Sequence, residues 1–420
     1  MNYVSHATCM ICAKTYKKDQ FDYICPDHGT EGILDIQYDY QAIKKAFSKA
    51  DLAASSDQSI FRYRPLLPVE HDSPAPTMVV GNSPLLEFDK LKNELGVHRL
   101  LIKDDGRLPT ASFKDRASTI AVVKAQELKA EVVTTASTGN AAAALSGICA
   151  SVGQKNVIFV PASAPQAKLA QLLMFGSTVI LVDGTYDDAF ELCLQVAGEY
   201  GWYNRNTGYN PYMTEGKKTC AYEICEQLSW RVPDAIFVSV GDGCIIGGIH
   251  KGLKDLLALG WIDRMPRLYG IQAEGSSYMA QAWKGGEDIV SKPPIVAETV
   301  ADSISAGLPR DRIKALNAVK YTHGAYITVS DDQIIRAIPD LARKTGVFAE
   351  PAGAATWAGI QKAARQGLIK STDTVVMINT GSGLKDIPSA MDAVSRVGLQ
   401  YFKVEPTIEN FKKIAPQLNL

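Results

Sequence analysis

From about residue 97 onward, short apolar runs alternate along the chain with amphipathic stretches of helical length. Strands separated by such helices become parallel neighbours, because a crossover connection is needed to return the chain to the same edge of a sheet. The alternation therefore predicts an α/β fold with mostly parallel sheets flanked by helices. Ligands of such sheets bind outside the carboxyl ends of the strands, so the residues that follow each predicted strand are candidate site residues.

The pattern also predicts the positions of individual elements. Strands are expected at residues 97–103, 131–135, 157–160, 178–182, 235–240, 267–273 and 374–379. Helices are expected at residues 41–54, 115–129, 140–152, 166–175, 187–200 and 216–230, and from residue 246 onward. A connector follows the first helix and contains Pro65, Pro68, Pro74 and Pro76.

At 420 residues the chain exceeds one ordinary hydrophobic core, so we expect two domains and a small appendage. Residues 1–40 are expected to form the appendage, and residues 41–96 the lead-in helix, the connector and the start of the large domain. Residues 97–205 are expected to form the smaller half of the main body, and residues 206–420 its larger half.

The composition argues against several classes of protein. A net charge of −1 argues against a nucleic-acid-binding protein, which would carry a basic face. No run of about 20 apolar residues is present to span a membrane. We expect no signal peptide, because the first residues lack a basic segment followed by an apolar one. Eight cysteines are spread along the chain, which favours a reduced, cytoplasmic setting over a disulfide framework.

Two short knuckles of metal-ligand residues lie near the N-terminus. Cys9 and Cys12 form the first, and Cys25 and His28 form the second. This spacing suits a tetrahedral zinc site, and a closed site with four ligands would be structural because no position is left for water. The metal would stabilise a segment too small to fold on apolar burial alone. The alternative is a set of unlinked thiols and a surface histidine.

The run Pro-Thr-Ala-Ser-Phe-Lys-Asp-Arg at residues 109–116 places Lys114 between an aromatic ring and an Asp-Arg pair. The pKa of a lysine ammonium shifts readily when the group is desolvated, which suits it to covalent binding of an aldehyde and to proton transfer. Lys114 is therefore the candidate catalytic residue.

Three turns follow predicted strands and form candidate binding loops. The first comprises Ser137, Thr138, Gly139 and Asn140, whose amides and hydroxyls at a helix start can hold a carboxylate; the alternative is an ordinary helix cap. The second comprises Gly241, Asp242, Gly243, Cys244 and Ile245, where glycines free the backbone to wrap an anion. The third begins with the hydroxyl of Thr380 in a Thr-Gly-Ser-Gly turn.

The motif around Lys114 resembles the cofactor-lysine motif of the threonine synthase family, which belongs to the fold type II pyridoxal-phosphate enzymes, the tryptophan synthase β-like superfamily. Shorter matching runs at residues 81–85, 210–212, 215–219, 350–353 and 380–386 follow in order along the chain. The resemblance implies a two-domain fold, a homodimer and an N-terminal zinc ribbon, although the family usually has a cysteine in the place of His28.

The resemblance also implies a role for each candidate residue. Lys114 would bind pyridoxal 5'-phosphate, Asn140 would bond its phenolic oxygen, and Thr380 would bond its pyridine nitrogen. The cofactor phosphate would be held by Gly241, Asp242, Gly243, Cys244 and Ile245. The α-carboxylate of the substrate would be held by Ser137, Thr138 and Gly139. Asp242 departs from the family, and a carboxylate beside a phosphate is unfavourable unless it points away.

The implied activity is that of a lyase in threonine biosynthesis, which converts O-phospho-L-homoserine and water to L-threonine and phosphate. The partner would be a small amino-acid substrate, without nucleic acid or membrane. The family holds the substrate phosphate partly through a hydroxyl and an arginine, where this chain has Gly208 and Met213. Lys103, Arg107 and Arg205 are the candidate replacements, because a bound dianion needs charge-assisted donors.

Two alternatives remain open at this point. One is a threonine/serine dehydratase-like enzyme or a β-replacing synthase that acts on another amino acid. The other is a cofactor-free binding protein that has kept the fold.

Overall fold

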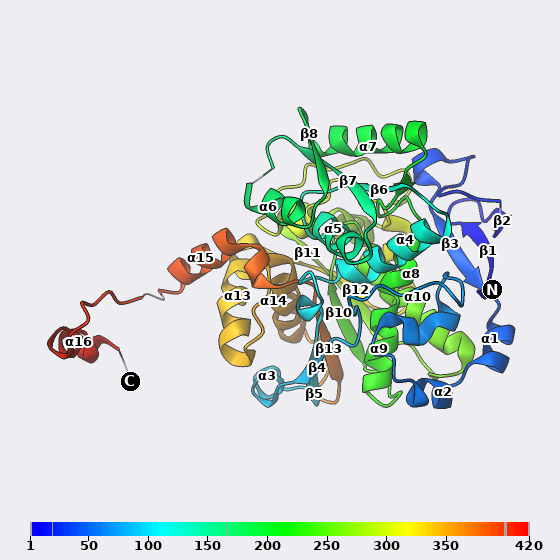
Figure 1. Cartoon of the computed structure of the whole chain (residues 1–420). Coiled ribbons are helices and arrows are strands. Elements are labelled where there is room, and N and C mark those ends of the chain that lie inside the picture. The colour runs from blue at the N-terminus through cyan, green and yellow to red at the C-terminus, as the bar shows by residue number, and fades with distance from the viewer. Residues whose placement is uncertain (1, 19, 165, 399–400, 419–420) are drawn as a thin grey trace.

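The computed structural model describes residues 2–18, 20–164, 166–398 and 401–418 (Figure 1). The strands are β1 (Val4–Cys9), β2 (Thr15–Lys17), β3 (Leu34–Tyr38), β4 (Leu85–Glu87), β5 (Arg99–Asp104), β6 (Val132–Ala136), β7 (Lys155–Pro161), β8 (Thr178–Val182), β9 (Tyr203–Asn204), β10 (Ala235–Ser239), β11 (Arg267–Ala273), β12 (Ala325–Val329) and β13 (Thr374–Asn379). The α-helices are α1 (Tyr40–Ala46), α2 (Lys49–Ala54), α3 (Asp89–Leu95), α4 (Lys114–Glu127), α5 (Asn140–Val152), α6 (Gln166–Met174), α7 (Tyr186–Tyr200), α8 (Tyr212–Lys217), α9 (Thr219–Gln227), α10 (Cys244–Leu259), α11 (Tyr278–Gly285), α12 (Arg312–Tyr321), α13 (Asp331–Thr345), α14 (Pro351–Arg365), α15 (Ile387–Arg396) and α16 (Ile408–Ile414).

The large sheet has the strand order β12-β11-β10-β13-β5-β4, and its pairs are parallel except at the β4–β5 edge. The second sheet, β8-β7-β6-β9, is parallel throughout, and a small antiparallel sheet has the order β2-β1-β3. The parallel α/β architecture expected from the alternation is therefore present.

The strand order corrects one predicted boundary. β5 lies beside β13, with Arg99 paired to Thr374, so it belongs to the large sheet. Residues 97–205 were expected to form the smaller half together, but only the strands between residues 132 and 204 form the second sheet. A lone apolar run gives no information about which partner strand it will find, and here the partner lies at the far end of the sequence.

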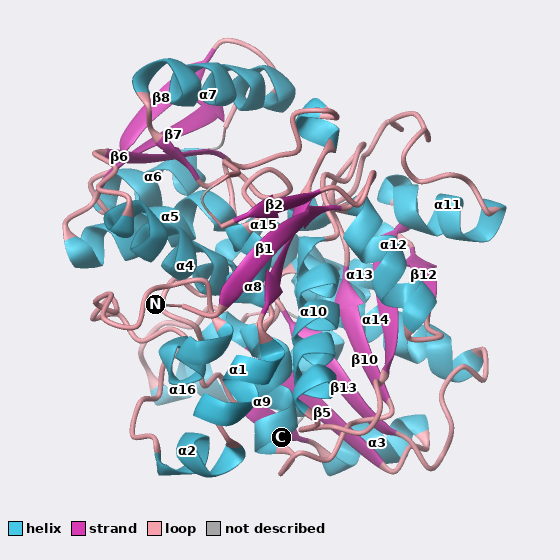
Figure 2. Cartoon of the chain, turned by 90° about the vertical axis from the view of Figure 1, so that its right-hand side faces the viewer, coloured by secondary structure: helices cyan, strands magenta, loops and turns pink. Residues whose placement is uncertain are grey.

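Helices cover both faces of the large sheet, as the arrangement around β10 shows (Figure 2). Ile236 and Val238 join a core with helices α9 and α10, whereas Ala235 and Phe237 join a second core with α13 and α14. All four side chains are fully buried. A strand buried on both faces has a continuous apolar sequence, as expected for a parallel sheet between two helical layers.

Two predicted helices are each divided in the structure. The helix expected at residues 41–54 is split into α1 and α2, because Ser48 caps α2: its Oγ accepts from the Asp51 N–H, and the Asp51 carboxylate accepts from the Ser48 N–H. This reciprocal capping fixes a new helix start. The helix expected at residues 216–230 is similarly split into α8 and α9.

Strand β3 packs the N-terminal sheet against helices α8 and α10. Ile36 is fully buried in the core that contains α10. The carboxylate of Asp35 pairs with Nζ of Lys251 at 2.9 Å, and the hydroxyl of Tyr38 donates to Glu215 at 2.6 Å. The segment expected as an appendage is thus anchored to the larger half through buried polar contacts as well as apolar ones.

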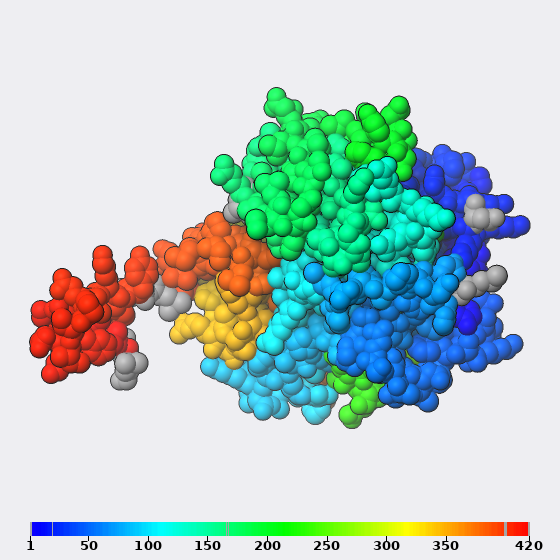
Figure 3. Space-filling view, viewed as in Figure 1, coloured from blue at the N-terminus to red at the C-terminus, as the bar shows by residue number. Residues whose placement is uncertain are grey.

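The C-terminal end extends away from the body, as Figures 1 and 3 show. Its helix α16 leaves Ile408 and Phe411 62% and 42% exposed. In the part of the chain that the structure describes, no helix combines the length and the apolar character needed to cross a membrane.

Candidate active site

A cavity of about 830 Å³ lies at the carboxyl ends of β6 and β10. Twelve of the residues singled out in the sequence line it: Lys114, Ser137, Thr138, Gly139, Asn140, Arg205, Gly241, Asp242, Gly243, Cys244, Ile245 and Thr380. They come from segments that are far apart in the sequence and belong to two sheets, both of which contribute residues after the carboxyl ends of their strands to this cavity.

Lys114 begins α4 and is partly buried at the cavity wall. Burial lowers the pKa of its ammonium group, while Cys244 and Asp242 oppose this shift. The preceding residue fixes the lysine against the third turn, because the Phe113 N–H donates to the carbonyl of Thr380 at 2.9 Å. The lysine is therefore held in a rigid frame and biased toward its neutral, nucleophilic form.

The Asp-Arg pair that follows Lys114 holds the lysine segment in place. Arg116 is fully buried and forms ion pairs with Asp105 and Glu223, each with a nitrogen–oxygen distance of 2.6 Å. Asp115 accepts a hydrogen bond from the Thr110 N–H at 2.8 Å. These contacts explain why a charged pair adjoins the lysine without lining the cavity.

The first turn leads into α5 beside a carboxylate. Gly139 is the N-cap of the helix, and no atom lies within 4 Å of the position that a Cβ would take there. Nδ2 of Asn140 donates to both carboxylate oxygens of Glu350, at 3.0 and 2.9 Å. Burial raises the pKa of Glu350, while the hydrogen bond from Asn140 opposes this shift.

Glu350 is a cavity residue that the sequence analysis did not assign. Its signal in the sequence is the Glu-Pro-Ala-Gly run at residues 350–353, which is one of the matching motifs. Its sequence position does not show that it meets Asn140, which comes from the other sheet.

The second turn needs both of its glycines. A Cβ on Gly241 would lie 2.8 Å from Cα of Ile304, and a Cβ on Gly243 would lie 2.6 Å from Cβ of Ala315. Gly243 also has a φ of +88°, which favours glycine. The turn caps the N-terminus of α10, where free N–H groups and the helix dipole favour an anion.

The negative charge of Asp242 would repel an anion in this turn, but one of its carboxylate oxygens is engaged elsewhere. One carboxylate oxygen accepts from the backbone N–H of Arg310 at 3.3 Å. Burial raises the pKa of Asp242, and this hydrogen bond opposes the rise. The carboxylate thus helps to fix the loop at residue 310.

Thr380 supplies an unused polar group at the cavity wall. Its hydroxyl is buried and has no hydrogen-bond partner among the described residues. An unpartnered buried hydroxyl is unfavourable unless a ligand completes it. A reactive lysine, an anion-binding turn and a free hydroxyl together fit pyridoxal phosphate.

Two of the predicted substrate-binding cations lie elsewhere. Lys103 is fully buried and pairs with Glu223 at 2.7 Å, so its charge is already compensated. Arg107 has a side chain that is 59% exposed and pairs with Asp104 at 3.0 Å. Neither is among the described residues that line the cavity, and the geometry therefore gives no support to the prediction that they bind substrate.

Arg205 does line the cavity, and so does Arg310, which the sequence analysis missed. Arg205 is 1% exposed and its Nη1 donates to Oγ1 of Thr207 at 3.1 Å, whereas Nη2 has no partner among the described residues. Burial lowers the pKa of Arg205 to about 10. The guanidinium group of Arg310 pairs with Asp187 at 3.5 Å and lies 4.8 Å from the centre of the Phe190 ring.

The four predicted zinc ligands converge in the N-terminal sheet. One donor atom from each of Cys9, Cys12, Cys25 and His28 lies within 4.8 Å of every other. The sulfurs of Cys12 and Cys25 are 3.9 Å apart, close to the separation of about 3.8 Å that follows from tetrahedral Zn–S bonds of about 2.3 Å. Nε2 of His28 is buried and has no partner among the described residues. The donor set and its geometry fit zinc.

Comparison with known proteins agrees with this geometry. Residues 76–381 match the profile of a family described as pyridoxal-phosphate dependent enzyme. The chain is 40% identical to the threonine synthase of Methanocaldococcus jannaschii, over 98% of this chain and 99% of that protein. It is 39% identical to the threonine synthase of Methanosarcina acetivorans, over 92% of this chain and 94% of that protein.

Solved structures share the fold at lower identity. The processed form of threonine deaminase isoform 2 from Solanum lycopersicum has a TM-score of 0.65 at 24% identity, covering 76% of this chain and 84% of that one. Diaminopropionate ammonia lyase from Escherichia coli has a TM-score of 0.65 at 18% identity, covering 84% and 93%. At such identities the likeness shows the fold alone. The family profile and the more similar relatives show that the chain belongs to the pyridoxal-phosphate dependent enzymes and, among these, to the threonine synthase family.

Proposed function

We propose that the protein converts O-phospho-L-homoserine and water to L-threonine and phosphate, with pyridoxal phosphate bound at Lys114. The observation that carries this proposal is that one cavity contains two kinds of anion-binding group. The turn at residues 241–245 offers backbone N–H groups at a helix N-terminus, and Arg205 and Arg310 offer two guanidinium groups. A cofactor phosphate and a substrate phosphate together require such a set of donors.

Within this cavity, different residues would bind the cofactor and the substrate. The N–H groups of residues 241–245 would hold the cofactor phosphate, and the hydroxyl of Thr380 would bond its ring nitrogen. Bound pyridoxal phosphate supplies an electron sink for charge that develops on the substrate carbons. The N–H groups at the start of α5 would hold the substrate carboxylate.

Lys114 would move the protons. Its Nζ has a lowered pKa, so the neutral amine that can accept a proton is more populated than on a surface lysine. The same nitrogen would take a proton from Cα of the substrate and return one at a neighbouring carbon. Arg205 and Arg310 would hold the phosphate until it leaves, because charge-assisted donors in a dry pocket bind dianions best.

We further propose that the N-terminal sheet carries one zinc ion on Cys9, Cys12, Cys25 and His28. None of these ligands lines the cavity described above, and all four positions are filled by protein, so the ion would be structural. We also propose that the protein acts in the cytoplasm as a homodimer with a small amino acid as its only substrate class. Its larger half would include the N-terminal sheet, and its smaller half the sheet between residues 132 and 204.

A direct assay tests the proposed reaction. The holoenzyme should release inorganic phosphate from O-phospho-L-homoserine and form threonine. Release of a ketoacid from threonine or serine, with no phosphate release, would instead establish the dehydratase-like alternative. Lys114→Ala in the same assay shows whether either activity arises from this cavity.

A further inference from the structure

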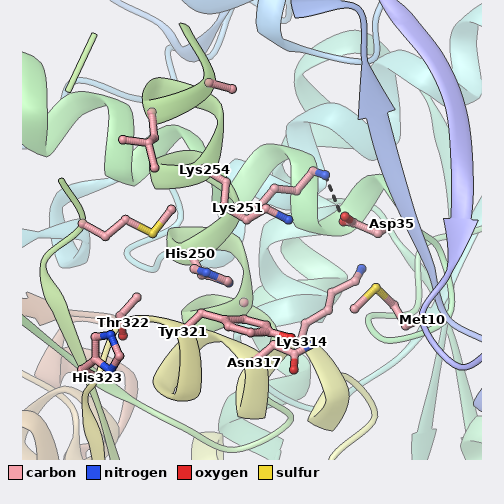
Figure 4. A pocket seen from close by; sticks show the side chains of 14 residues that line it. Met10, Asp35, His250, Lys251, Lys254, Lys314, Asn317, Tyr321, Thr322 and His323 are labelled. Carbon is pink, nitrogen blue, oxygen red and sulfur yellow. Dashed lines mark hydrogen bonds and ion pairs between the residues drawn. The ribbon is translucent and has the colours of Figure 1, made fainter. Parts of the chain in front are cut away.

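A second cavity, of about 740 Å³, lies between the N-terminal sheet and helices α10 and α12 (Figure 4). It shares no described lining residue with the cavity around Lys114. Pockets of about 300–1,000 Å³ accommodate small-molecule ligands. The proposed reaction makes no use of this space.

His250 lies at the centre of the lining residues in Figure 4, below Lys251 and Lys254 and above Tyr321. Its side chain is only 7% exposed, yet neither ring nitrogen has a hydrogen-bond partner among the described residues. Burial, with a smaller contribution from Lys254, lowers the pKa of His250 to about 4. The neutral ring therefore offers one donor and one acceptor that no protein group uses.

The charges around the cavity favour an anion. Three lysines and one carboxylate line it. Lys251 pairs with Asp35 at 2.9 Å, and Nζ of Lys314 donates to the carbonyl of Leu34 at 2.9 Å. Lys254 is exposed and forms no hydrogen bond or ion pair with any residue that the structure describes. A free positive charge thus remains at the rim.

The rest of the lining suits a flat, partly apolar body. The ring of Tyr321 is 62% exposed and stacks on His250, with centroids 6.3 Å apart and planes 20° from parallel. Met10 and Met265 also line the cavity. Methionine side chains adapt to ligands of varied shape and contact aromatic rings favourably.

We propose that this second cavity binds a small organic anion with a flat, partly apolar body. The anionic group lies at Lys254, a polar edge bonds His250, and the flat body packs on Tyr321. The site is separate from the proposed reaction and does not depend on it.

The test uses 1-anilinonaphthalene-8-sulfonate, a flat organic anion, titrated into the holoenzyme by calorimetry. Two related probes separate its parts: N-phenyl-1-naphthylamine lacks the sulfonate, and inorganic sulfate lacks the rings. We expect one saturable site per chain for the complete probe and weaker binding of each part. Because losing a charge-assisted contact weakens binding by about tenfold or more, Lys254→Gln should raise Kd by that factor.

Tyr321→Ala should weaken the same binding, and both side chains are exposed enough for the variants to fold. Lys155→Gln, on the exposed end of β7, is the matched control and should leave Kd unchanged. Phosphate release should be unchanged in all three variants. The proposal is overturned if the probe shows no saturable site, or if its Kd is the same in Lys254→Gln, Tyr321→Ala and the wild type.

Discussion

A Cβ on Gly208 would lie 2.3 Å from Cβ of Arg310, so the glycine provides the space in which Arg310 stands at the cavity wall. Gly208 also has a φ of +74°, which disfavours any other residue. In the sequence, Gly208 stands where the family has a hydroxyl residue that helps to hold the substrate phosphate. In the structure, its lack of a side chain admits an arginine from a segment a hundred residues away.

Gly208→Ala should therefore act through Arg310. The added methyl group must displace the arginine or strain the turn, so KM for O-phospho-L-homoserine should rise while the cofactor absorbance stays intact. Steady-state kinetics and a visible spectrum measure both. An unchanged KM would show that Arg310 does not depend on this contact.

Arg310→Ala and Arg205→Ala should each weaken binding of O-phospho-L-homoserine. The loss of a charge-assisted contact costs about 1.5–3 kcal/mol, which is roughly a tenfold to somewhat over hundredfold change in affinity. Arg107→Ala is the matched control, because that side chain is 59% exposed and lies outside the cavity lining. If both cavity variants keep the wild-type kcat/KM, the arginines do not hold the substrate phosphate.

The covalent position of the cofactor has its own test. Borohydride treatment of the holoenzyme should fix a pyridoxyl group on Lys114, as peptide mapping would show. Lys114→Ala should fold but lose the covalent cofactor, and its turnover should fall by at least the ~10²–10⁴-fold typical of a proton-transfer residue. A pyridoxyl group mapped to another lysine would refute the assignment.

Metal analysis should find one zinc per chain. His28→Ala should lower the melting temperature more than it lowers the turnover of the folded enzyme, because a metal bound there would stabilise the N-terminal sheet and none of its four ligands lines the cavity. His71→Ala, at an exposed position, is the control and should change neither. Zinc-free protein with freely titratable thiols at Cys9, Cys12 and Cys25 would contradict the site.

The lowered pKa of the Glu223 carboxyl predicts that the free energy of unfolding depends on pH. Burial alone would raise the pKa of the Glu223 carboxyl. The charges of Arg116 and Lys103 outweigh burial and lower this pKa from an ordinary value of 4.5 to about 2. A carboxylate whose pKa is lowered in the folded state stabilises that state above its unfolded pKa. Its contribution should therefore be complete above about pH 4.5 and disappear as the pH falls toward about 2.

Glu223→Gln should thus reduce the free energy of unfolding by about 3–5 kcal/mol at neutral pH, because two buried cations lose their shared partner. The difference from the wild type should shrink as the pH falls below 4.5. Urea titrations at several pH values measure it. Glu131→Gln removes an exposed carboxylate and should have little effect at any pH; a similar loss there would contradict the buried network as the cause.

The elements of the fold were largely predictable because each is encoded locally. The strands at residues 267–273 and 374–379 match β11 and β13 at both ends. The twelve cavity residues were also predictable, since most of them follow predicted strands, where parallel sheets bind ligands, but no local pattern shows that the two sheets share one cavity. The wrong prediction of one continuous helix at residues 41–54 also has a local cause. The sequence contains the capping pair Ser48 and Asp51, which starts a new helix and divides the expected one.

Contacts between distant segments were not predictable in this way. Lys103 precedes the lysine motif closely, and nothing near it in the sequence shows that Glu223 neutralises its charge. Arg310 lies in a loop without any motif, and its place at the cavity depends on the space left by Gly208. The partner of a buried charge is set by tertiary packing, which a local pattern does not contain.

The pairing of β5 with β13 has a consequence for synthesis on the ribosome. The second sheet uses only strands between residues 132 and 204, so it can assemble soon after that segment leaves the exit tunnel. The large sheet is incomplete until Thr374–Asn379 has emerged, which leaves one edge of β5 unpaired for most of translation. Domains generally fold as units while the chain grows, and unpaired strand edges favour aggregation. Nascent chains that stop just short of β13 should therefore depend on chaperones far more than those that extend past it.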